Sequence, residues 1–206
     1  MVGERRRYEK IKYVSVDLET TGLNEDTCDI VEFAAVADDL KQQLPINQLP
    51  VFHTYFLKDR YLGEPFALSM HPEIFRRIAE RDTKKYTFMS ATKLGYAFRR
   101  FLVEKGGYEE KHDQVTITVA GKNFAAFDLQ FLKRKTDLCK HVNIRSRVID
   151  PAILYLEDKD DAPPGTEKCK ERAHLNPKVE HTAEADAKDV IALVRYKLGN
   201  IFFLPF

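Results

Sequence analysis

Two acidic residues interrupt an otherwise apolar segment near the start of the chain. The stretch "YVSVDLETTGL" (residues 13–23) begins like a buried β-strand and then places Asp17 and Glu19 two residues apart. Because strand side chains alternate between the two faces, both carboxylates belong to the same face. Two like charges at that spacing repel, and burying them is costly unless a cation offsets the charge. We therefore expect either a bound cation between them or a strand that ends at Val16 and leaves both acids in water.

Two further acids occur on the apolar sides of predicted helices. Asp128 lies between Phe127 and Phe131 in "NFAAFDLQFL", and Asp186 lies four residues before Val190 in "HTAEADAKDVIALV". Residues three and four positions apart share one face of a helix, so both acids are expected to point inward. A single inward acid is commonly a capped or salt-bridged structural residue. Two such acids, added to a pair on a strand, favour a shared site.

Four carboxylates from three elements suit the binding of divalent cations. Mg²⁺ prefers oxygen ligands and keeps several waters. Two such ions roughly 4 Å apart can stabilise the attacking and leaving oxygens when a phosphodiester is hydrolysed. The four acids Asp17, Glu19, Asp128 and Asp186 therefore predict an open metal site for phosphodiester chemistry.

The rest of the sequence predicts the elements that would position these acids. Strands are expected at residues 11–19, 29–38, 51–57 and 115–121, and a fifth, short one in "RVIDPAIL", followed by a turn of helix. Helices are expected over "HPEIFRRIAERD", from Ser90 to Gly106, from near Asn123, and from about Thr182 to Leu198. The short link between the first two strands favours an antiparallel hairpin. The apolar strand 115–121 is expected to be covered on both faces, and the polar residues 157–180 to form a long loop with one helical piece.

The composition limits the classes of protein to consider. The chain has 206 residues, 44% hydrophobic and 32% charged, which predicts one mixed α/β domain over residues 1–206. The net charge of +1 argues against nucleic-acid binding through bulk charge, so any such contact must be local. The run Arg5-Arg6-Arg7 is one candidate, and a solvated tail is the alternative.

The location of the protein can also be predicted from the sequence. No apolar stretch approaches the roughly 20 residues of a membrane span. The first ten residues, "MVGERRRYEK", contain no apolar region, which predicts no secretory signal. The three cysteines, Cys28, Cys139 and Cys169, are far apart and form no C-x-x-C pair, which argues against a disulfide framework or a zinc site. We expect a reducing intracellular location, the cytoplasm.

Three segments together resemble the motifs of a known enzyme family. "VDLETTGL", "NFAAFDLQFL" and "HTAEADA" occur in the order of the three exonuclease motifs of the DEDDh 3′–5′ exonucleases, which include DnaQ-like proofreading subunits, ribonuclease T and oligoribonucleases. The resemblance extends from about Lys12 to Leu198, and the second strand keeps the Ile30-Val31-Glu32 pattern that such enzymes often show. It implies a ribonuclease H-like fold, with a five-stranded mixed sheet flanked by helices. It also implies hydrolysis from the 3′ end of single-stranded DNA, RNA or short oligonucleotides, with release of nucleoside 5′-monophosphates.

The resemblance also implies roles for particular residues. The four acids would bind two Mg²⁺ or Mn²⁺ ions. The general base of this superfamily is either a histidine five residues before the last aspartate or a tyrosine four residues before it. Here those positions are His181 and Thr182, so the sequence resembles the histidine type. A histidine titrates near neutral pH and is suited to take a proton from the attacking water. The alternative for His181 is a loop histidine with no role.

Contacts with the 3′-terminal nucleotide are implied for five residues. These are Thr20, Thr21, Leu23, Asn123 and Phe124. In relatives, backbone near the Thr-Thr-Gly turn contacts the terminal sugar, and the apolar residue after it wedges against the last base. Phe124 would either stack on a base or belong to the core.

Some segments depart from the family pattern and leave the substrate open. Residues 63–85, "GEPFALSMHPEIFRRIAERDTKK", match only loosely the region where relatives often carry His-Gly-Ile, and residues 157–180 show no family pattern. The alternatives to an exonuclease are a catalytically inactive nucleic-acid-binding or adaptor domain on the same fold, and a ribonuclease H-type endonuclease. The intact acids argue against the first, and His181 with the "TTGL" turn argues against the second. Many relatives dimerise, so the tail "IFFLPF" would pack on a second copy in a homodimer or close the core.

Overall fold

Alternating side chains of the first strand, β1 (Lys12–Thr20), enter two separate hydrophobic cores. Val14, Val16 and Leu18 belong to one core, whereas Tyr13 belongs to a second core built with the last helix, α8 (Ala183–Val194). Because strand residues alternate, Asp17 and Glu19 share the face of Tyr13. The two acids therefore continue the face of the sheet that α8 covers.

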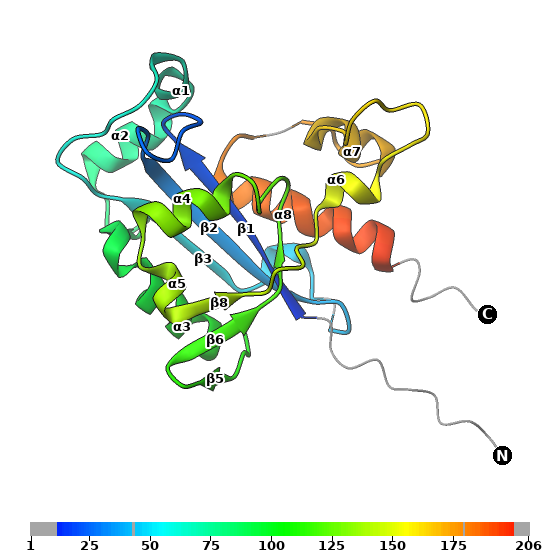
Figure 1. The fold of residues 1–206 in the computed structure, drawn as a ribbon, viewed down its shortest axis with the longest axis horizontal. Coiled ribbons are helices and arrows are strands. Elements are labelled where there is room, and N and C mark those ends of the chain that lie inside the picture. Colours follow the sequence, from blue (N-terminus) through cyan, green and yellow to red (C-terminus); the bar gives the residue numbers. More distant parts are fainter. Residues whose placement is uncertain (1–11, 43, 179, 200–206) are drawn as a thin grey trace.

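The computed structural model describes residues 12–42, 44–178 and 180–199. Its main sheet has five strands in the order β4-β3-β2-β1-β7 (Figure 1). Besides β1, these strands are β2 (Ile30–Asp39), β3 (Val51–Phe56), β4 (Phe88–Met89) and β7 (Val119–Ala120). The pairs β1–β2 and β2–β3 are antiparallel, whereas β3–β4 and β1–β7 are parallel. The expected mixed α/β architecture, with a five-stranded mixed sheet flanked by helices, is confirmed.

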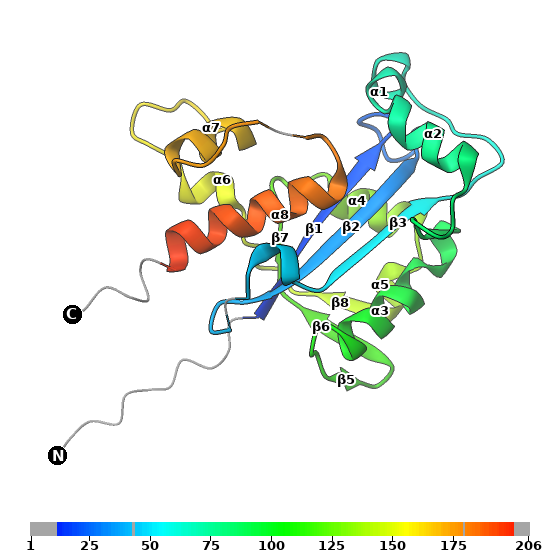
Figure 2. The ribbon, with the colours of Figure 1, turned by 180° about the vertical axis from the view of Figure 1, so that it is seen from behind.

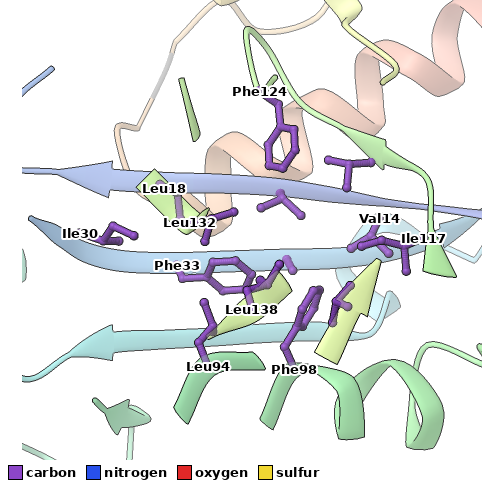
Figure 3. Close-up of a cluster of buried hydrophobic side chains, with 14 of the residues drawn as sticks. Val14, Leu18, Ile30, Phe33, Leu94, Phe98, Ile117, Phe124, Leu132 and Leu138 are labelled. Atoms are coloured by element: carbon purple, nitrogen blue, oxygen red, sulfur yellow. The ribbon is translucent and has the colours of Figure 1, made fainter. Parts of the chain in front are cut away.

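Helices cover both faces of this sheet. Helix α8 runs across one face (Figures 1 and 2). On the other face pack α3 (Leu94–Glu104), α4 (Asp128–Lys135) and α5 (Leu138–His141). Figure 3 shows Leu94 and Phe98 near Phe33 of β2, whose ring meets that of Phe98 edge-on with centroids 5.3 Å apart. The inward residues of both layers recur at helical spacing, which is why the sequence predicts these helices.

Shorter elements lie around the main sheet and α8. Helices α1 (Pro65–Met70) and α2 (Pro72–Glu80) lie beside the arrowhead of β1 (Figure 1). Helices α6 (Pro151–Leu154) and α7 (Thr166–Arg172) pack near α8, where the Tyr155 hydroxyl donates to the Leu193 carbonyl at 2.9 Å. The remaining helical turns are the 3₁₀ segments η1 (Ile46–Gln48) and η2 (Ala91–Lys93) and the π-helical η3 (Arg195–Gly199). None of the described helices has the length and apolar character needed to cross a lipid bilayer.

The predicted strand 115–121 is wrong as a single strand covered on both faces. The chain breaks at Thr118 into β6 (Gln114–Ile117) and β7, which belong to different sheets. Strand β6 pairs with β5 (Glu110–Lys111) and β8 (Val142–Ile144) in a second, three-stranded sheet. Its residues alternate between exposed and buried, so β6 is covered on one face only.

Two further boundaries differ from the sequence-based expectation. The fifth strand shrinks to one parallel bridge between Ala120 and Ile149, because Asp150 already caps α6 by accepting from Ala152 N at 2.8 Å. Helix α4 begins at Asp128 rather than near Asn123, whose φ of 54° places it in the left-handed region outside a helix. Arg5-Arg6-Arg7 and "IFFLPF", for which nucleic-acid and dimer contacts were expected, lie outside the described residues.

Candidate metal centre

The acids predicted from the sequence meet where β1 ends. Asp17 and Glu19 come from the last part of β1, and Asp186 from the first turn of α8. One carboxylate oxygen from each of these three residues lies within 4.8 Å of those of the other two. Within residues 12–42, 44–178 and 180–199, this is the only group of three or more acidic, histidine or cysteine side chains close enough to share a metal ion.

Asp128 joins the cluster from the opposite layer. It is the first residue of α4, is only 5% exposed, and accepts a hydrogen bond from the backbone of Leu18. Asp128 is not one of the three residues that share the 4.8 Å spacing. Its charge nevertheless reaches Asp17 and raises the pKa of that carboxyl. The hydrogen bond from Leu18 therefore places the start of α4 against β1, beside the other acids.

Burial raises the pKa of all four carboxyls. The pKa of Asp17 lies well above its ordinary value because of burial first, and then because of the charges of Asp128 and Asp186. Burial and the charge of Glu32 raise the pKa of Glu19 to about 8. Burial raises the pKa of Asp128 to about 7 and that of Asp186 to about 6. At neutral pH such a cluster is stable only if it binds protons or cations.

The donor atoms fit hard divalent cations. Oδ1 of Asp186 is buried and has no hydrogen-bond partner among the described residues. Lys170, whose charge lowers the pKa of Asp186, is itself engaged with Asp189 at 2.5 Å. A set made only of carboxylate oxygens, with one oxygen unpaired, suits Mg²⁺ or Mn²⁺ better than zinc.

His181 stands directly before the helix that carries Asp186. Its side chain is exposed, and its φ of 53° lies in the left-handed region that few residues other than glycine adopt. Backbone strain of this kind clusters at functional sites. The positive charge of His181 lowers the pKa of Asp186, although burial outweighs it. His181 therefore lies beside Asp186 and is exposed to solvent.

Sequence reasoning missed a fifth acid at this site. Glu32 is 1% exposed and lies directly opposite Glu19 in the β1–β2 register, next to an irregularity between Glu19 and Thr20. Its Oε1 lies 2.6 Å from Nε2 of His53, and its Oε2 accepts a hydrogen bond from Ala183 N at 3.4 Å. The available signals were an acid in the middle of the apolar stretch "DIVEFAAVAD" and the Ile30-Val31-Glu32 pattern, which was not assigned to the site.

A buried histidine was also missed. His71, between α1 and α2, is 6% exposed, and its Nε2 lies 3.5 Å from Oε2 of Glu19. Burial lowers its pKa, and its Nδ1 has no hydrogen-bond partner among the described residues. No spacing in the sequence relates His71 to Glu19, because loops separate the two residues.

The residues expected to contact the substrate fall into two groups. Leu23 is 76% exposed and Asn123 is exposed, so both side chains are open to a ligand. The hydroxyl of Thr20 donates to the Gly22 carbonyl at 2.8 Å, and the hydroxyl of Thr21 accepts from Asp29 N at 2.8 Å. These threonine side chains are buried and build the turn that presents Leu23.

Phe124 is a correction to the expected substrate contacts. Its ring is 1% exposed and belongs to the same core cluster as Val14 and Leu132 (Figure 3). No face of the ring is open to stack on a base. Packing in the core therefore accounts for the aromatic residue at position 124.

A groove of about 660 Å³ lies beside the cluster, on the far side of Glu32. His53, Tyr55, Arg77 and Thr182 contribute to its walls, and none of the four predicted acids does. Glu32 therefore lines this groove and also lies opposite Glu19 of the cluster.

In comparisons with known proteins, the chain matches no family model and no curated protein. The arrangement of its own side chains therefore carries the functional conclusion.

Proposed function

We propose that the protein is a metal-dependent 3′–5′ exonuclease of the DEDDh type on a ribonuclease H-like fold. The observation that carries the proposal is the meeting of Asp17, Glu19, Asp128 and Asp186 from three elements, with an unpaired buried oxygen on Asp186. The five-stranded mixed sheet with helices on both faces is compatible with that fold. The position of His181 beside Asp186 supports the histidine subtype.

The four acids would bind Mg²⁺ or Mn²⁺, which is consistent with their all-oxygen donor set. When bound, such cations stabilise the negative charge that develops on the oxygens of a phosphodiester during hydrolysis. Burial raises the pKa of Glu19 to about 8 and that of Asp128 to about 7, so without cations protons offset part of the charge of the cluster at neutral pH. The cluster is therefore favoured by added positive charge.

His181 accepts the proton of the attacking water. Its exposed imidazole can exchange that proton with solvent, and imidazole is the side chain that most often serves as a general base. General base catalysis of this kind contributes typically ~10²–10⁴-fold to the rate.

Leu23 makes the enzyme act at an end of the strand. It projects from a turn fixed by Thr21, whose backbone carbonyl accepts from Glu64 N at 2.7 Å. A β-carbon on Gly63 would lie 2.3 Å from Cβ of Thr21, so the two segments pack too closely for a larger residue. A rigid turn with an exposed apolar tip can wedge against the 3′-terminal base and stop the strand from passing through.

The substrate is a single-stranded 3′ end of DNA, RNA or a short oligonucleotide, and the product is a nucleoside 5′-monophosphate. The net charge of +1 gives little electrostatic attraction for a duplex. The homodimer stays a prediction, because "IFFLPF" lies outside the described residues.

The test uses 5′-labelled single strands of DNA and RNA with Mn²⁺, resolved by product length over time. We expect a ladder that shortens from the 3′ end, no products in excess EDTA, and slower cleavage of blunt duplex. Asp17→Asn supplies the inactive control for contaminating nucleases. A circular single strand, which has no 3′ end, should stay intact, and its cleavage would indicate an endonuclease. Binding of the oligonucleotide without any cleavage would indicate the inactive adaptor instead.

A further inference from the structure

Glu32 is a buried carboxylate whose partners come from two different elements. His53 on the neighbouring strand β3 lies 2.6 Å from one oxygen, and the backbone N–H of Ala183 donates to the other at 3.4 Å. Ala183 is the first residue of α8, and it follows His181 by two positions. The single side chain of Glu32 therefore joins two strands of the sheet to the segment that presents His181.

The placement of this acid is electrostatically unfavourable. Glu32 raises the pKa of Glu19 after the larger effect of burial, and it also raises the pKa of Asp17. Replacing a buried charged group by a packed apolar one is often neutral or stabilising. Packing alone therefore does not account for an acid here, and its hydrogen bonds must supply what an apolar side chain cannot.

The hydrogen bond from Ala183 N to Glu32 lies at the N-terminus of α8. The first N–H groups of a helix have no partner within the helix, and a carboxylate at that end is favoured by the helix dipole. The hydroxyl of Thr182 accepts from Ala185 N at 3.4 Å, and Glu32 takes the N–H of Ala183. Asp186, by contrast, is held by the helix itself, since its N–H donates to the Thr182 carbonyl at 3.0 Å.

We propose that Glu32 is a positioning residue that acts through His181. Its carboxylate fixes the backbone at Ala183, His53 orients that carboxylate, and the left-handed turn at His181 is thereby held against the acids. This inference rests on the proposed function, since it assigns to Glu32 a role in the same reaction. It places Glu32 outside the set of metal-binding residues.

The first experiment compares Glu32→Leu with Glu32→Gln. Leucine is of similar size but offers no acceptor, whereas glutamine can accept from Ala183 and donate to a neutral His53. Displacement of His181 by about 1 Å predicts a fall in kcat of about 10- to 100-fold for Glu32→Leu. KM and the Mn²⁺ affinity, measured by calorimetry, should stay near wild type, and Glu32→Gln should recover most of kcat. Loss of Mn²⁺ affinity as large as that of Asp17→Asn would overturn the proposal, because Glu32 would then be a metal ligand.

The second experiment tests whether Glu32 acts through His181. If it does, adding Glu32→Leu to His181→Ala should slow single-turnover cleavage no further than His181→Ala alone. A purely structural role would instead add its own loss in the double variant, and that result would overturn the proposal.

A third readout does not depend on activity. Hydrogen exchange in residues 180–186 should be faster in Glu32→Leu than in wild type, with the second half of α8 unchanged. The matched control is Asp38→Asn, which removes another buried carboxylate of β2, one that contacts Arg195 after α8. It should accelerate exchange around Arg195 and leave kcat unaltered. If Glu32→Leu does not fold, Glu32→Asp replaces it, because the shortened side chain keeps the charge but no longer reaches Ala183.

The outcomes separate the two proposals. Absence of any metal-dependent cleavage by the wild type refutes the exonuclease, while the exchange experiment still tests the contact at Ala183. Cleavage by the wild type, with Glu32→Leu and Glu32→Asp equally fast, refutes the positioning role alone.

Discussion

The two ends of helix α8 are both joined to β2 by a buried acid, yet the acids have different surroundings. At the far end, Asp38 is 4% exposed and accepts from Nε and Nη2 of Arg195 at 3.0 and 2.5 Å. The hydroxyl of Tyr13 donates to the same carboxylate at 2.6 Å. At the near end, Glu32 faces other acids, and Oδ1 of Asp186 has no partner among the described residues.

This difference separates stability from function. The acid at the far end is balanced by an arginine, so the pair can hold the fold without any ligand. Burial and the charges of neighbouring acids raise the pKa of Asp17 and Glu19 at the near end, so protons or added cations stabilise this cluster. A buried acid that is paired with an arginine, as Asp38 is, can stabilise the fold. Buried acids without such a partner are typical of functional sites.

The largest contrast is expected from Asp17→Asn. It removes a central carboxylate of the cluster, so Mn²⁺ binding by calorimetry and cleavage of a labelled single strand should both be lost. The free energy of unfolding in EDTA should not fall, because asparagine relieves repulsion from Asp128 and Asp186. A variant that cleaves at the wild-type rate, or that unfolds in EDTA well before wild type, would remove the contrast between the two ends.

His181→Ala should separate proton transfer from metal binding at the near end. All four acids remain, so Mn²⁺ affinity should persist while single-turnover cleavage falls ~10²–10⁴-fold. Part of the rate should return at higher pH, where hydroxide is more abundant. Measurement across pH checks this, and an unchanged rate at pH 7 would make His181 a loop histidine and remove the histidine subtype.

Asp38→Asn should have the opposite profile, with lost stability and retained chemistry. Removing one partner of a buried pair leaves the Arg195 charge uncompensated, at a cost of about 3–5 kcal/mol. Urea unfolding measures this loss, and cleavage per folded molecule should match wild type. Asp38→Leu combined with Arg195→Leu should recover part of the stability, because no unpaired charge then remains.

The smallest effect is a pH dependence of stability in the metal-free protein. The folded-state pKa is raised to about 6 for Asp186, about 7 for Asp128 and about 8 for Glu19. Groups with raised pKa bind protons more tightly in the folded state, so their contribution is complete below about pH 4 and is lost as pH rises toward 8. Thermal unfolding in EDTA should therefore occur at lower temperature at pH 8 than at pH 5. Added Mn²⁺ should raise the midpoint more at pH 8, and equal increments at both values would contradict the assigned shifts.

Local patterns predicted those elements whose packing repeats along the chain. The first three strands and α8 were confirmed because alternation and helical spacing reflect burial directly, and Thr182 caps α8 with its hydroxyl. The break at Thr118 and the two-residue strand β4 were not predicted, because each depends on which distant segment lies alongside. Local spacing likewise could not tell that Phe124 faces the core.

In the candidate site, too, some residues were predicted from local spacing and others were not. Asp17, Glu19 and Asp186 are brought together as expected, because each lies on a regular element whose inward face is readable from its spacing. The approach of His71 to Glu19 depends on the path of a loop, and the contact of Glu32 with Ala183 joins residues 151 positions apart. Such contacts are set by tertiary structure, so the residue types suggest them only in retrospect.

The order of strands in the main sheet has a kinetic consequence. Strands β1, β2 and β3 form a local antiparallel meander, whereas β7 pairs with β1 across about a hundred residues, joining Val14 to Val119. Contacts distant in sequence tend to form late because closing the intervening loop costs entropy. We therefore expect Asp17 and Glu19 to be placed early in folding, and Asp128 and Asp186 to be placed with the late segments. We expect Mn²⁺ to slow unfolding in stopped-flow experiments and to leave the refolding rate nearly unchanged. The cation would then stabilise the folded protein without assisting the formation of the folding transition state.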